Sequence, residues 1–285
     1  MDELVSIIIP TYNRGYIIEE CIDNILRQTY PKFEIILIDD GSKDDTEKKV
    51  KAYNDARISY IYQENKGACA ARNAGVDFAK GGLIAFQDSD DLWQVDKLQR
   101  QVDVINETKA DLVFCKKNIA GRKKKDLRCM KEGFFDKKSN SLLGISTQTI
   151  LGKANVFKDN RFDVQMPRCQ ELELLIRLSN HYKIYCMDEI LVEYREQENS
   201  ISRNMKNLII ACELILEKNK SILDDMNVTK AAIIELMGSA KACMGINDWK
   251  LFQKAYNVDR KKKIYIKMVM AYCHILDKYY KTVRK

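Results

Sequence analysis

The stretch Leu83-Ile84-Ala85-Phe86-Gln87-Asp88-Ser89-Asp90-Asp91 decides the fold, because an apolar run is followed at once by three carboxylates. The apolar run predicts a buried strand of a parallel sheet, and such sheets bind ligands beyond the carboxyl ends of their strands. Two carboxylates two residues apart at such an end can share a hard cation with phosphate oxygens. The stretch therefore predicts either a metal–diphosphate site or a solvated acidic turn in which Asp91 caps the next helix.

Strand and helix signals alternate before this stretch. Short β-branched or apolar runs predict strands at residues 5–9, 33–38 and 58–62. Apolar residues with helical spacing predict a helix at 17–27, and small residues predict another at 70–79. Pro10 should stop the first strand, and Ser42 with Asp45 has the spacing of a capping box. The alternation predicts an α/β fold with a mostly parallel sheet and a row of loops at one edge.

The predicted loops carry residues suited to a nucleotide. Tyr12 can stack on a base, Asp39 and Asp40 can accept from base or ribose, and Arg72 can pair with phosphate. Each of them alone could equally be a turn or cap residue. Their recurrence at successive strand ends predicts a nucleotide site.

Length and composition indicate a soluble globular protein. The 285 residues are 46% hydrophobic and 31% charged, which suits one large domain or two smaller ones. No apolar run approaches the ~18 residues of a membrane-spanning helix, and the N-terminus does not resemble a secretion signal. The nine cysteines form no C-x-x-C pair, so they fit neither a disulfide framework nor a zinc site. We expect a cytoplasmic protein with reduced thiols.

The positive charge is concentrated in the C-terminal part. Residues 203–285 hold 17 Lys and Arg against 8 Asp and Glu, an excess of 9, so residues 1–202 contribute −2 to the net charge of +7. A basic region suggests an anionic partner, although a solvated face would look the same.

The last helical stretch repeats large residues at three- and four-residue steps. They are Tyr265, Met268, Val269, Tyr272, Leu276, Tyr279 and Val283. Such a stripe usually packs against its own domain, and we favour packing onto the catalytic body. Because basic clusters flank the stripe, peripheral contact with an anionic membrane at the inner face is the second interpretation.

Four ordered motifs resemble those of family 2 glycosyltransferases. They are Val5-Ser6-Ile7-Ile8-Ile9-Pro10-Thr11-Tyr12-Asn13-Arg14, Ile38-Asp39-Asp40-Gly41-Ser42, Asn65-Lys66-Gly67 through Arg72-Asn73-Ala74-Gly75, and Phe86-Gln87-Asp88-Ser89-Asp90-Asp91-Leu92-Trp93. The resemblance implies a GT-A catalytic domain at 1–202, with a nucleotide-sugar half up to about 115 and an acceptor half from about 116. A basic helical region, 203–285, follows this domain.

The resemblance also implies roles for individual residues. Those that would bind the nucleotide or donor sugar are Pro10, Tyr12, Arg14, Asp40, Arg72 and Asp88. Tyr12 would lie against the base, Asp40 would accept from it, and Asp90 would hold Mg²⁺ or Mn²⁺ against the diphosphate. The implied reaction moves a sugar, with inversion, from a nucleoside diphosphate to a glycan or lipid-linked acceptor. Among similar enzymes uridine is the common base, and cell-surface polysaccharide the common product.

Inversion in one displacement needs a base for the acceptor hydroxyl. Similar family members usually place an Asp at the start of the helix that follows Pro167, and Glu171 stands at that position, one methylene longer. We predict Glu171 as the base, with Glu173 second. Both could instead be first-turn acids favoured by the helix dipole.

Two further segments are candidates for contacts with the acceptor or for covering the site. The basic segment 121–125 could contact a phosphate-bearing acceptor or be a hydrated hairpin tip, and 199–202 is expected in a loop over the site.

Two other functions stay open. A nucleotidyltransferase can share this sheet and its acidic metal site, and a non-catalytic nucleotide-sugar-binding protein could serve in an assembly. The sequence also allows a homo-oligomer and gives no reason to expect nucleic acid as a partner.

Overall fold

The computed structural model describes residues 3–120, 131–195, 204–273 and 275–283. The chain forms two compact units. The first comprises Met1–Phe135, Gly144–Val164 and His181–Gln197, and the second Asp136–Leu143, Gln165–Asn180 and Glu198–Lys285. In this division, residues 165–180 group with the C-terminal helices, and the boundary of the catalytic domain at residue 202 stays a prediction.

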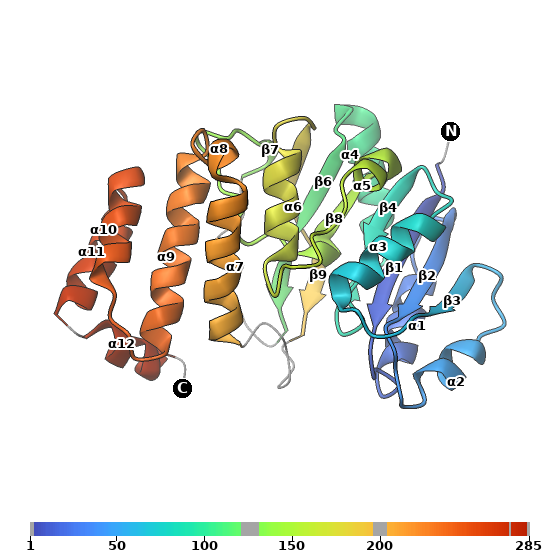
Figure 1. The fold of residues 1–285 in the computed structure, drawn as a ribbon. Helices are drawn as coiled ribbons and strands as arrows, with labels where there is room; N and C mark the ends of the chain where they lie inside the picture. Colours follow the sequence, from blue (N-terminus) through green and yellow to red (C-terminus); the bar gives the residue numbers. More distant parts are fainter. Residues whose placement is uncertain (1–2, 121–130, 196–203, 274, 284–285) are drawn as a thin grey trace. The chain divides into compact units, whose positions relative to one another are not determined.

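The first unit is built on a mixed sheet (Figure 1). Its strands are β1 (Val5–Thr11), β2 (Phe33–Asp39), β3 (Ile58–Tyr62), β4 (Leu83–Phe86), β5 (Leu92–Trp93), β6 (Leu112–Ile119), β7 (Gly133–Phe134), β8 (Ile150–Lys153) and β9 (Ile184–Tyr194). Their order is β3-β2-β1-β4-β8-β6-β9-β5, with β7 paired to β9. The first four strands are parallel, as predicted, and β8 is antiparallel to both β4 and β6.

β1 continues through Pro10 to Thr11, so the prediction that Pro10 ends the strand is wrong. Ile8 O accepts from Gln87 N–H on the β4 side, whereas Thr11 O accepts from Asp40 N–H on the β2 side. Since backbone groups alternate along a strand, the Pro10 nitrogen faces the β4 side. The pairing with β4 has already ended at Ile8 and Phe86, so the missing N–H costs no ladder hydrogen bond.

Helices cover both faces of the parallel strands. Alternate residues of β1, such as Ile7, pack with α1 (Ile18–Leu26) and α4 (Lys97–Thr108). On the other face lie α3 (Ala68–Phe78) and α5 (Ala154–Asp159). A Cβ at Gly75 of α3 would lie 2.3 Å from Ile8 Cγ2, so the glycine allows α3 to pack this close to β1. α2 (Thr46–Lys51) follows β2, and a 3₁₀ turn, η1 (Thr147–Thr149), precedes β8.

The second unit is helical. Its helices are α6 (Gln170–Leu178), α7 (Met205–Lys218), α8 (Lys220–Leu223), α9 (Asn227–Cys243), α10 (Trp249–Val258), α11 (Lys262–Tyr272) and α12 (Leu276–Val283). Two small apolar clusters, one around Ile234 and Ile264 and one around Phe252 and Leu276, hold the C-terminal helices together. In the described part of the chain, no helix combines the length and apolar character needed to cross a bilayer.

Candidate functional site

The predicted donor residues of the first unit lie at one edge of the sheet. β1, β2, β3 and β4 are parallel, and their carboxyl ends are followed by Tyr12 to Arg14, Asp40, residues 63–67 and Asp88 to Asp91. Tyr12 is 45% exposed just beyond β1, and Pro10 is partly buried in the strand itself. The edge therefore brings together the residues predicted to bind the nucleotide.

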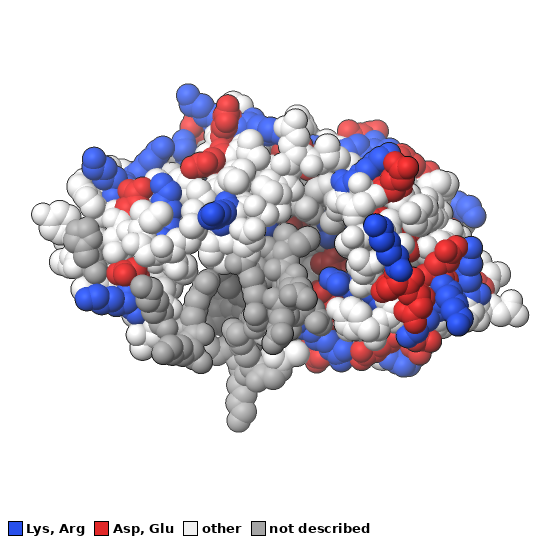
Figure 2. Space-filling model, turned by 60° about the horizontal axis from the view of Figure 1, so that its bottom comes forward, with Lys and Arg blue, Asp and Glu red and all other residues white. Residues whose placement is uncertain are grey.

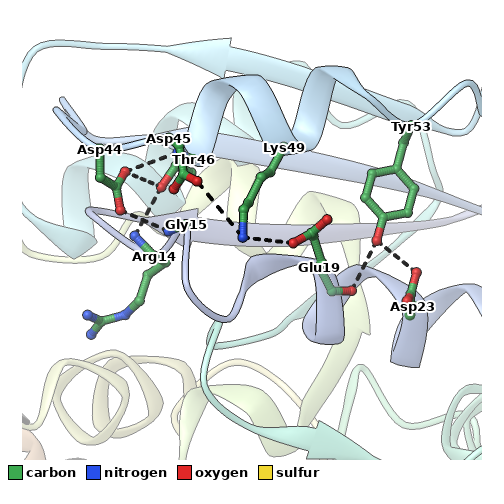
Figure 3. Close-up of polar contacts among 9 residues, drawn as sticks. All are labelled: Arg14, Gly15, Glu19, Asp23, Asp44, Asp45, Thr46, Lys49 and Tyr53. Carbon is green, nitrogen blue, oxygen red and sulfur yellow. Dashed lines mark hydrogen bonds and ion pairs between the residues drawn. The ribbon is translucent and has the colours of Figure 1, made fainter.

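The loop after β1 is held by the start of α2 (Figure 3). Arg14 N–H donates to Thr46 Oγ1 at 3.0 Å, and Gly15 N–H donates to Asp44 Oδ2 at 2.9 Å. A Cβ at Gly15 would lie 1.9 Å from Asp45 Oδ1, so a larger residue would require the exposed Asp45 side chain to move. The Arg14 side chain points away from the cluster in Figure 3, which leaves its guanidinium available to the sheet edge.

A second set of contacts joins α2 and the residues after it to α1 (Figure 3). Lys49 Nζ lies 2.8 Å from Glu19 Oε2, and Tyr53 OH donates to Asp23 Oδ1 at 2.8 Å. These groups are exposed or partly exposed, so each contact contributes little alone. Together with the hydrogen bond from Arg14 N–H to Thr46, these contacts hold the loop between β1 and α1 against α2.

The capping box predicted from Ser42 and Asp45 is wrong. α2 begins at Thr46, and the side chain of its N-cap Asp45 makes no cap hydrogen bond. Ser42 Oγ instead accepts from Asn13 N–H at 2.8 Å, and Asn13 Oδ1 accepts from Lys43 N–H at 2.9 Å. Asn13 has φ 51°, a left-handed conformation that asparagine tolerates. Sequence reasoning did not single out this loop-joining role, although the motif contains Asn13.

Asp40 organises the loop between β3 and α3. Its carboxylate accepts from Gln63 Nε2 at 2.7 Å, Lys66 N–H at 2.8 Å and Gly67 N–H at 2.8 Å. A carboxylate has about four acceptor sites, so these bonds leave room for roughly one more donor. Three of the hydrogen bonds that Asp40 can accept therefore hold the loop between β3 and α3. The predicted hydrogen bond to a base would use its fourth acceptor position.

Arg72 reaches the site from α3. Its Nη2 lies 2.8 Å from Asp88 Oδ1, and its guanidinium lies 5.7 Å from the centre of the Phe162 ring. The Phe162 ring in turn packs edge-on against Phe86, with ring centres 5.2 Å apart. Arg72 is thus held between a carboxylate and an aromatic ring, as a positioned cation requires.

Asn73 fixes the segment that carries Phe162. Its Nδ2 donates to Phe162 O at 2.9 Å, and its Oδ1 accepts from Phe162 N–H at 2.9 Å. The paired bonds join α3 to a segment 89 residues later, and they set the place of the ring beside Arg72. The sequence offered no signal for this contact beyond the position of Asn73 in its motif.

The charges around Asp90 suit a carboxylate that binds a cation. Burial and the neighbouring Asp88 charge raise the pKa of Asp90, while the Arg14 guanidinium, at 4.0 Å from Nη2 to Oδ2, opposes them. A divalent cation would relieve this crowding of negative charge. No group of three or more potential metal ligands occurs among the described residues, so phosphate oxygens and water would have to complete the coordination. The residues present fit such a shared site.

Asp91 does not cap a helix, because α4 begins only at Lys97. Its Oδ1 accepts from Arg195 N–H at 2.9 Å, and its Oδ2 accepts from Gln148 Nε2. Burial, followed by the charge of Asp88, raises the pKa of Asp91 to about 8. Asp91 therefore anchors the acidic segment to the end of β9, a role that the sequence did not reveal.

The two candidate bases lie in the second unit. Glu171 and Glu173 stand in the first turn of α6, as predicted. Glu173 is buried and forms a paired interaction with Arg177, with distances of 2.8 and 2.9 Å. Glu171 is partly exposed. Glu173 is thus committed to a structural ion pair, and Glu171 remains the predicted base. Segments 121–125 and 199–202 lie outside the described residues.

Comparisons with known proteins agree with this geometry. The family model described as glycosyl transferase family 2 matches residues 6–160. The "Putative teichuronic acid biosynthesis glycosyltransferase TuaG" of Bacillus subtilis is 33% identical over 210 residues, which are 70% of this chain and 82% of that relative. An Escherichia coli relative, "UDP-Glc:alpha-D-GlcNAc-diphosphoundecaprenol beta-1,3-glucosyltransferase WfgD", is 44% identical over 105 residues, or 36% of this chain and 42% of that relative.

Solved structures confirm the predicted α/β GT-A fold with its C-terminal helices. TarS of Staphylococcus aureus, residues 1–349 in complex with UDP, has a TM-score of 0.69 at 19% identity, covering 97% of this chain and 89% of that one. The mannosyltransferase PcManGT of Pyrobaculum calidifontis, in complex with GDP-Man and Mn²⁺, has a TM-score of 0.62 at 17% identity, covering 100% and 88%. By its family model and its relatives, this chain belongs to glycosyl transferase family 2.

Proposed function

We propose that the chain transfers a sugar from a nucleoside diphosphate sugar to a hydroxyl of a glycan or lipid-linked acceptor. The observation that carries this is the placement of Arg14 and Arg72 beside Asp90 and Asp88 at the carboxyl edge of the parallel strands. Two guanidinium groups can bind diphosphate oxygens, and the carboxylates can hold a cation between them. The edge thus has the charges that a metal–diphosphate needs.

Asp90, with Asp88 beside it, would hold Mg²⁺ or Mn²⁺. Such a cation, when bound, offsets the charge that develops on the leaving diphosphate. The Arg72 guanidinium would also stabilise the negative charge on the leaving diphosphate. It would do so from a fixed position, because Phe162 and Asp88 restrain it. The Mn²⁺ in the PcManGT structure supports a divalent metal here.

We propose uridine as the base of the donor. TarS has been solved with UDP and with UDP-GlcNAc, and the name of WfgD specifies UDP-Glc. Tyr12 would stack on the base because it is exposed at the end of β1, and Asp40 would accept from the base with its remaining site. The name of WfgD also specifies a diphosphoundecaprenol acceptor, which supports a lipid-linked acceptor.

Glu171 would be the base of an inverting displacement. The acceptor oxygen attacks the anomeric carbon from the face opposite the diphosphate, its proton passes to Glu171, and the bond to the diphosphate breaks with its electron pair. The burial of Glu173 in its paired interaction with Arg177 argues against Glu173 as the base.

The first experiment measures thermal stability with UDP, GDP, ADP and their sugars, each with and without Mn²⁺. A ligand bound only by the native state adds about 2.7 kcal/mol at a hundredfold excess over Kd. We expect a shift with UDP or a UDP-sugar that depends on Mn²⁺. The absence of a shift with every nucleotide would overturn the donor site.

Product analysis then separates the alternatives. A glycosyltransferase releases nucleoside diphosphate, whereas a nucleotidyltransferase consumes nucleoside triphosphate and releases pyrophosphate. Donor binding without transfer to any lipid-linked or glycan acceptor offered would favour the non-catalytic binding protein.

A further inference from the structure

Exposed apolar side chains are concentrated near the C-terminus. Of the sixteen large hydrophobic residues that are exposed in the described chain, eight lie between residues 244 and 279. They are Met244, Ile246, Tyr265, Ile266, Val269, Tyr272, Ile275 and Tyr279. Single exposed hydrophobic residues are ordinary, whereas several that share one surface mark an interaction site.

The centre of this concentration is one side of α11. Tyr265, Ile266, Val269 and Tyr272 are 47%, 48%, 41% and 65% exposed. At about 100° per residue, these four positions fall within an arc of about 120°, which we call the α11 face. The opposite side of the helix is buried through Ile264 and Ala271. Of the predicted stripe, Met268 and Leu276 pack among the C-terminal helices, whereas Tyr265, Val269 and Tyr272 stay exposed. Packing of the stripe onto the catalytic body stays a prediction.

The charges around the α11 face are basic. Arg260, Lys261, Lys262 and Lys263 are all exposed at the start of the helix, and Lys262 falls within the arc of the face itself. Lys261 pairs with Asp259, and Lys263 lies 3.3 Å from Glu235. Within the described chain, Arg260 and Lys262 take part in no ion pair.

The surface view agrees with this distribution. Figure 2 shows mostly uncharged side chains with Lys, Arg and a few acidic side chains over the C-terminal helices, at its left end, whereas acidic and basic side chains are more densely mixed at its right end. Opposite charges that lie close together largely cancel, whereas the basic edge of the α11 face attracts an anionic surface.

We propose that the α11 face docks on the surface of an anionic lipid bilayer. Tyrosine rings suit the boundary between lipid and water, because the ring is apolar and the hydroxyl stays hydrated. Apolar Ile266 and Val269 would enter the acyl boundary, and Lys262 and Arg260 would meet lipid phosphates. With 11 residues, α11 would lie in the plane of the interface.

A second copy of the chain is a poorer occupant of this face. Two α11 faces in contact would bury Lys262 from each copy, and neither face supplies a carboxylate to pair with it. Buried unpaired charge is costly, whereas lipid phosphates provide the missing charge. The proposal concerns a surface of the second unit and does not depend on the sugar-transfer reaction.

Vesicle sedimentation of the purified full chain tests the proposal. One set of vesicles contains only phosphatidylcholine, and in the other phosphatidylglycerol replaces part of it. We expect the protein to sediment with the anionic vesicles, to stay largely in solution with the neutral ones, and to dissociate as salt is raised. Equal partition on both kinds of vesicle, or on neither, would overturn the proposal.

Two variants identify the surface. The double change Ile266→Ser and Val269→Ser should weaken binding to anionic vesicles roughly tenfold, because it removes apolar groups from the interface. Lys262→Gln should weaken it about fivefold, the effect of one basic residue near an anionic surface. Circular dichroism and thermal unfolding establish that each variant is folded.

Matched controls use exposed residues of the first unit. Phe78→Ser removes a ring that is 52% exposed on α3, and Lys48→Gln removes an exposed charge on α2. Both should bind anionic vesicles like the unchanged chain. If the controls weaken binding as much as the α11 variants, the attraction is a general one and the α11 face is not the docking site. If light scattering shows a dimer that the double change dissociates, a second copy occupies the face instead.

Discussion

Arg72 and Asp88 form an ion pair of 2.8 Å in which 7% of the arginine side chain and 29% of the aspartate side chain are exposed. The arginine comes from a helix and the aspartate from the loop after β4, so the pair fixes two separate parts of the sheet edge. Desolvated pairs of this kind are costly to break from one side, because the remaining charge loses its partner. The relationship leads directly to a stability prediction.

Arg72→Met should lower the free energy of unfolding by about 2 kcal/mol, because Asp88 would remain beside Asp90 without its counter-charge. Adding Asp88→Asn should restore part of the loss. Urea denaturation of the single and double variants measures the coupling. Arg57→Met is the control, since 40% of the Arg57 side chain is exposed and the loss of its pair with Asp55 should cost less than about 1 kcal/mol. A loss at Arg72 no larger than at Arg57 would contradict the structural role.

Phe162→Leu should weaken binding of nucleoside diphosphate several-fold, because the ring that restrains the Arg72 guanidinium is lost. Phe157→Leu is a matched control, because its ring also packs edge-on against Phe86, at 5.0 Å, whereas the Arg72 guanidinium lies over the Phe162 ring. Both variants should lose roughly 1 kcal/mol of stability, and only Phe162→Leu should change the Kd in calorimetry. Equal changes in Kd for both variants would show a general packing effect.

We expect Lys97 to make the free energy of unfolding depend on pH. Complete burial lowers its pKa from 10.5 to about 8, and its ammonium lies 3.7 Å from the centre of the Trp93 ring. Between pH 8 and 10.5 the unfolded chain keeps the proton that the native chain has lost, so the free energy of unfolding rises with pH. A shift of this size corresponds to at most about 3 kcal/mol.

Lys97→Met should remove this rise, so the variant should be the more stable form at pH 7 by roughly 1 kcal/mol and lose that advantage by pH 10. Denaturant unfolding across this range measures the difference between the two forms. Lys51→Met, at an exposed lysine paired with Glu47, is the control for the general effect of replacing a lysine by methionine. A difference at Lys97 that does not change with pH would mean that the native pKa of Lys97 is not lowered.

Asp90→Asn should separate stability from metal binding. Without ligands the change should leave stability the same or raise it by about 1 kcal/mol, because it removes a largely buried carboxylate that lies beside the charge of Asp88. The Mn²⁺-dependent stabilisation by nucleoside diphosphate should disappear. Asp103→Asn, on the exposed side of α4, should keep it. Retention of the full metal effect in Asp90→Asn would remove Asp90 as the ligand.

Glu171→Gln should reduce sugar transfer at least a hundredfold with donor Kd unchanged, since a positioned base contributes about that much. Glu173→Gln should instead lower stability by about 2 kcal/mol, because it breaks the buried pair with Arg177. Initial rates, calorimetry and thermal unfolding distinguish the two effects. Full transfer activity in Glu171→Gln would exclude it as the base.

Local sequence patterns were sufficient to predict the strands and most of the residues at the sheet edge. The apolar runs at 5–9, 33–38, 58–62 and 83–86 predicted β1 to β4, and the residues directly after them lie at one edge. A strand is recognisable from its own residues because an apolar run and β-branched side chains are properties of the segment itself. The parallel order follows from the helices between the strands.

Other features depended on distant partners. Pro10 stays in β1 because the pairing with β4 has ended on its side, and Ser42 binds Asn13 in place of a helix start. No pattern within a few residues of Asp91 points to Arg195, 104 residues later. Such contacts depend on which strands and loops become neighbours.

The sequence by itself thus determined the α/β class, the parallel core and the residues of the acidic edge, because periodicity and strand termini are properties of short segments. Only the tertiary structure decided that Asp40 shapes a loop, that Phe162 restrains Arg72, that α6 groups with the C-terminal helices, and that one side of α11 stays exposed. Burial and hydrogen-bond partners are set by segments brought together from far apart in the chain, and a single segment carries no record of its neighbours in space.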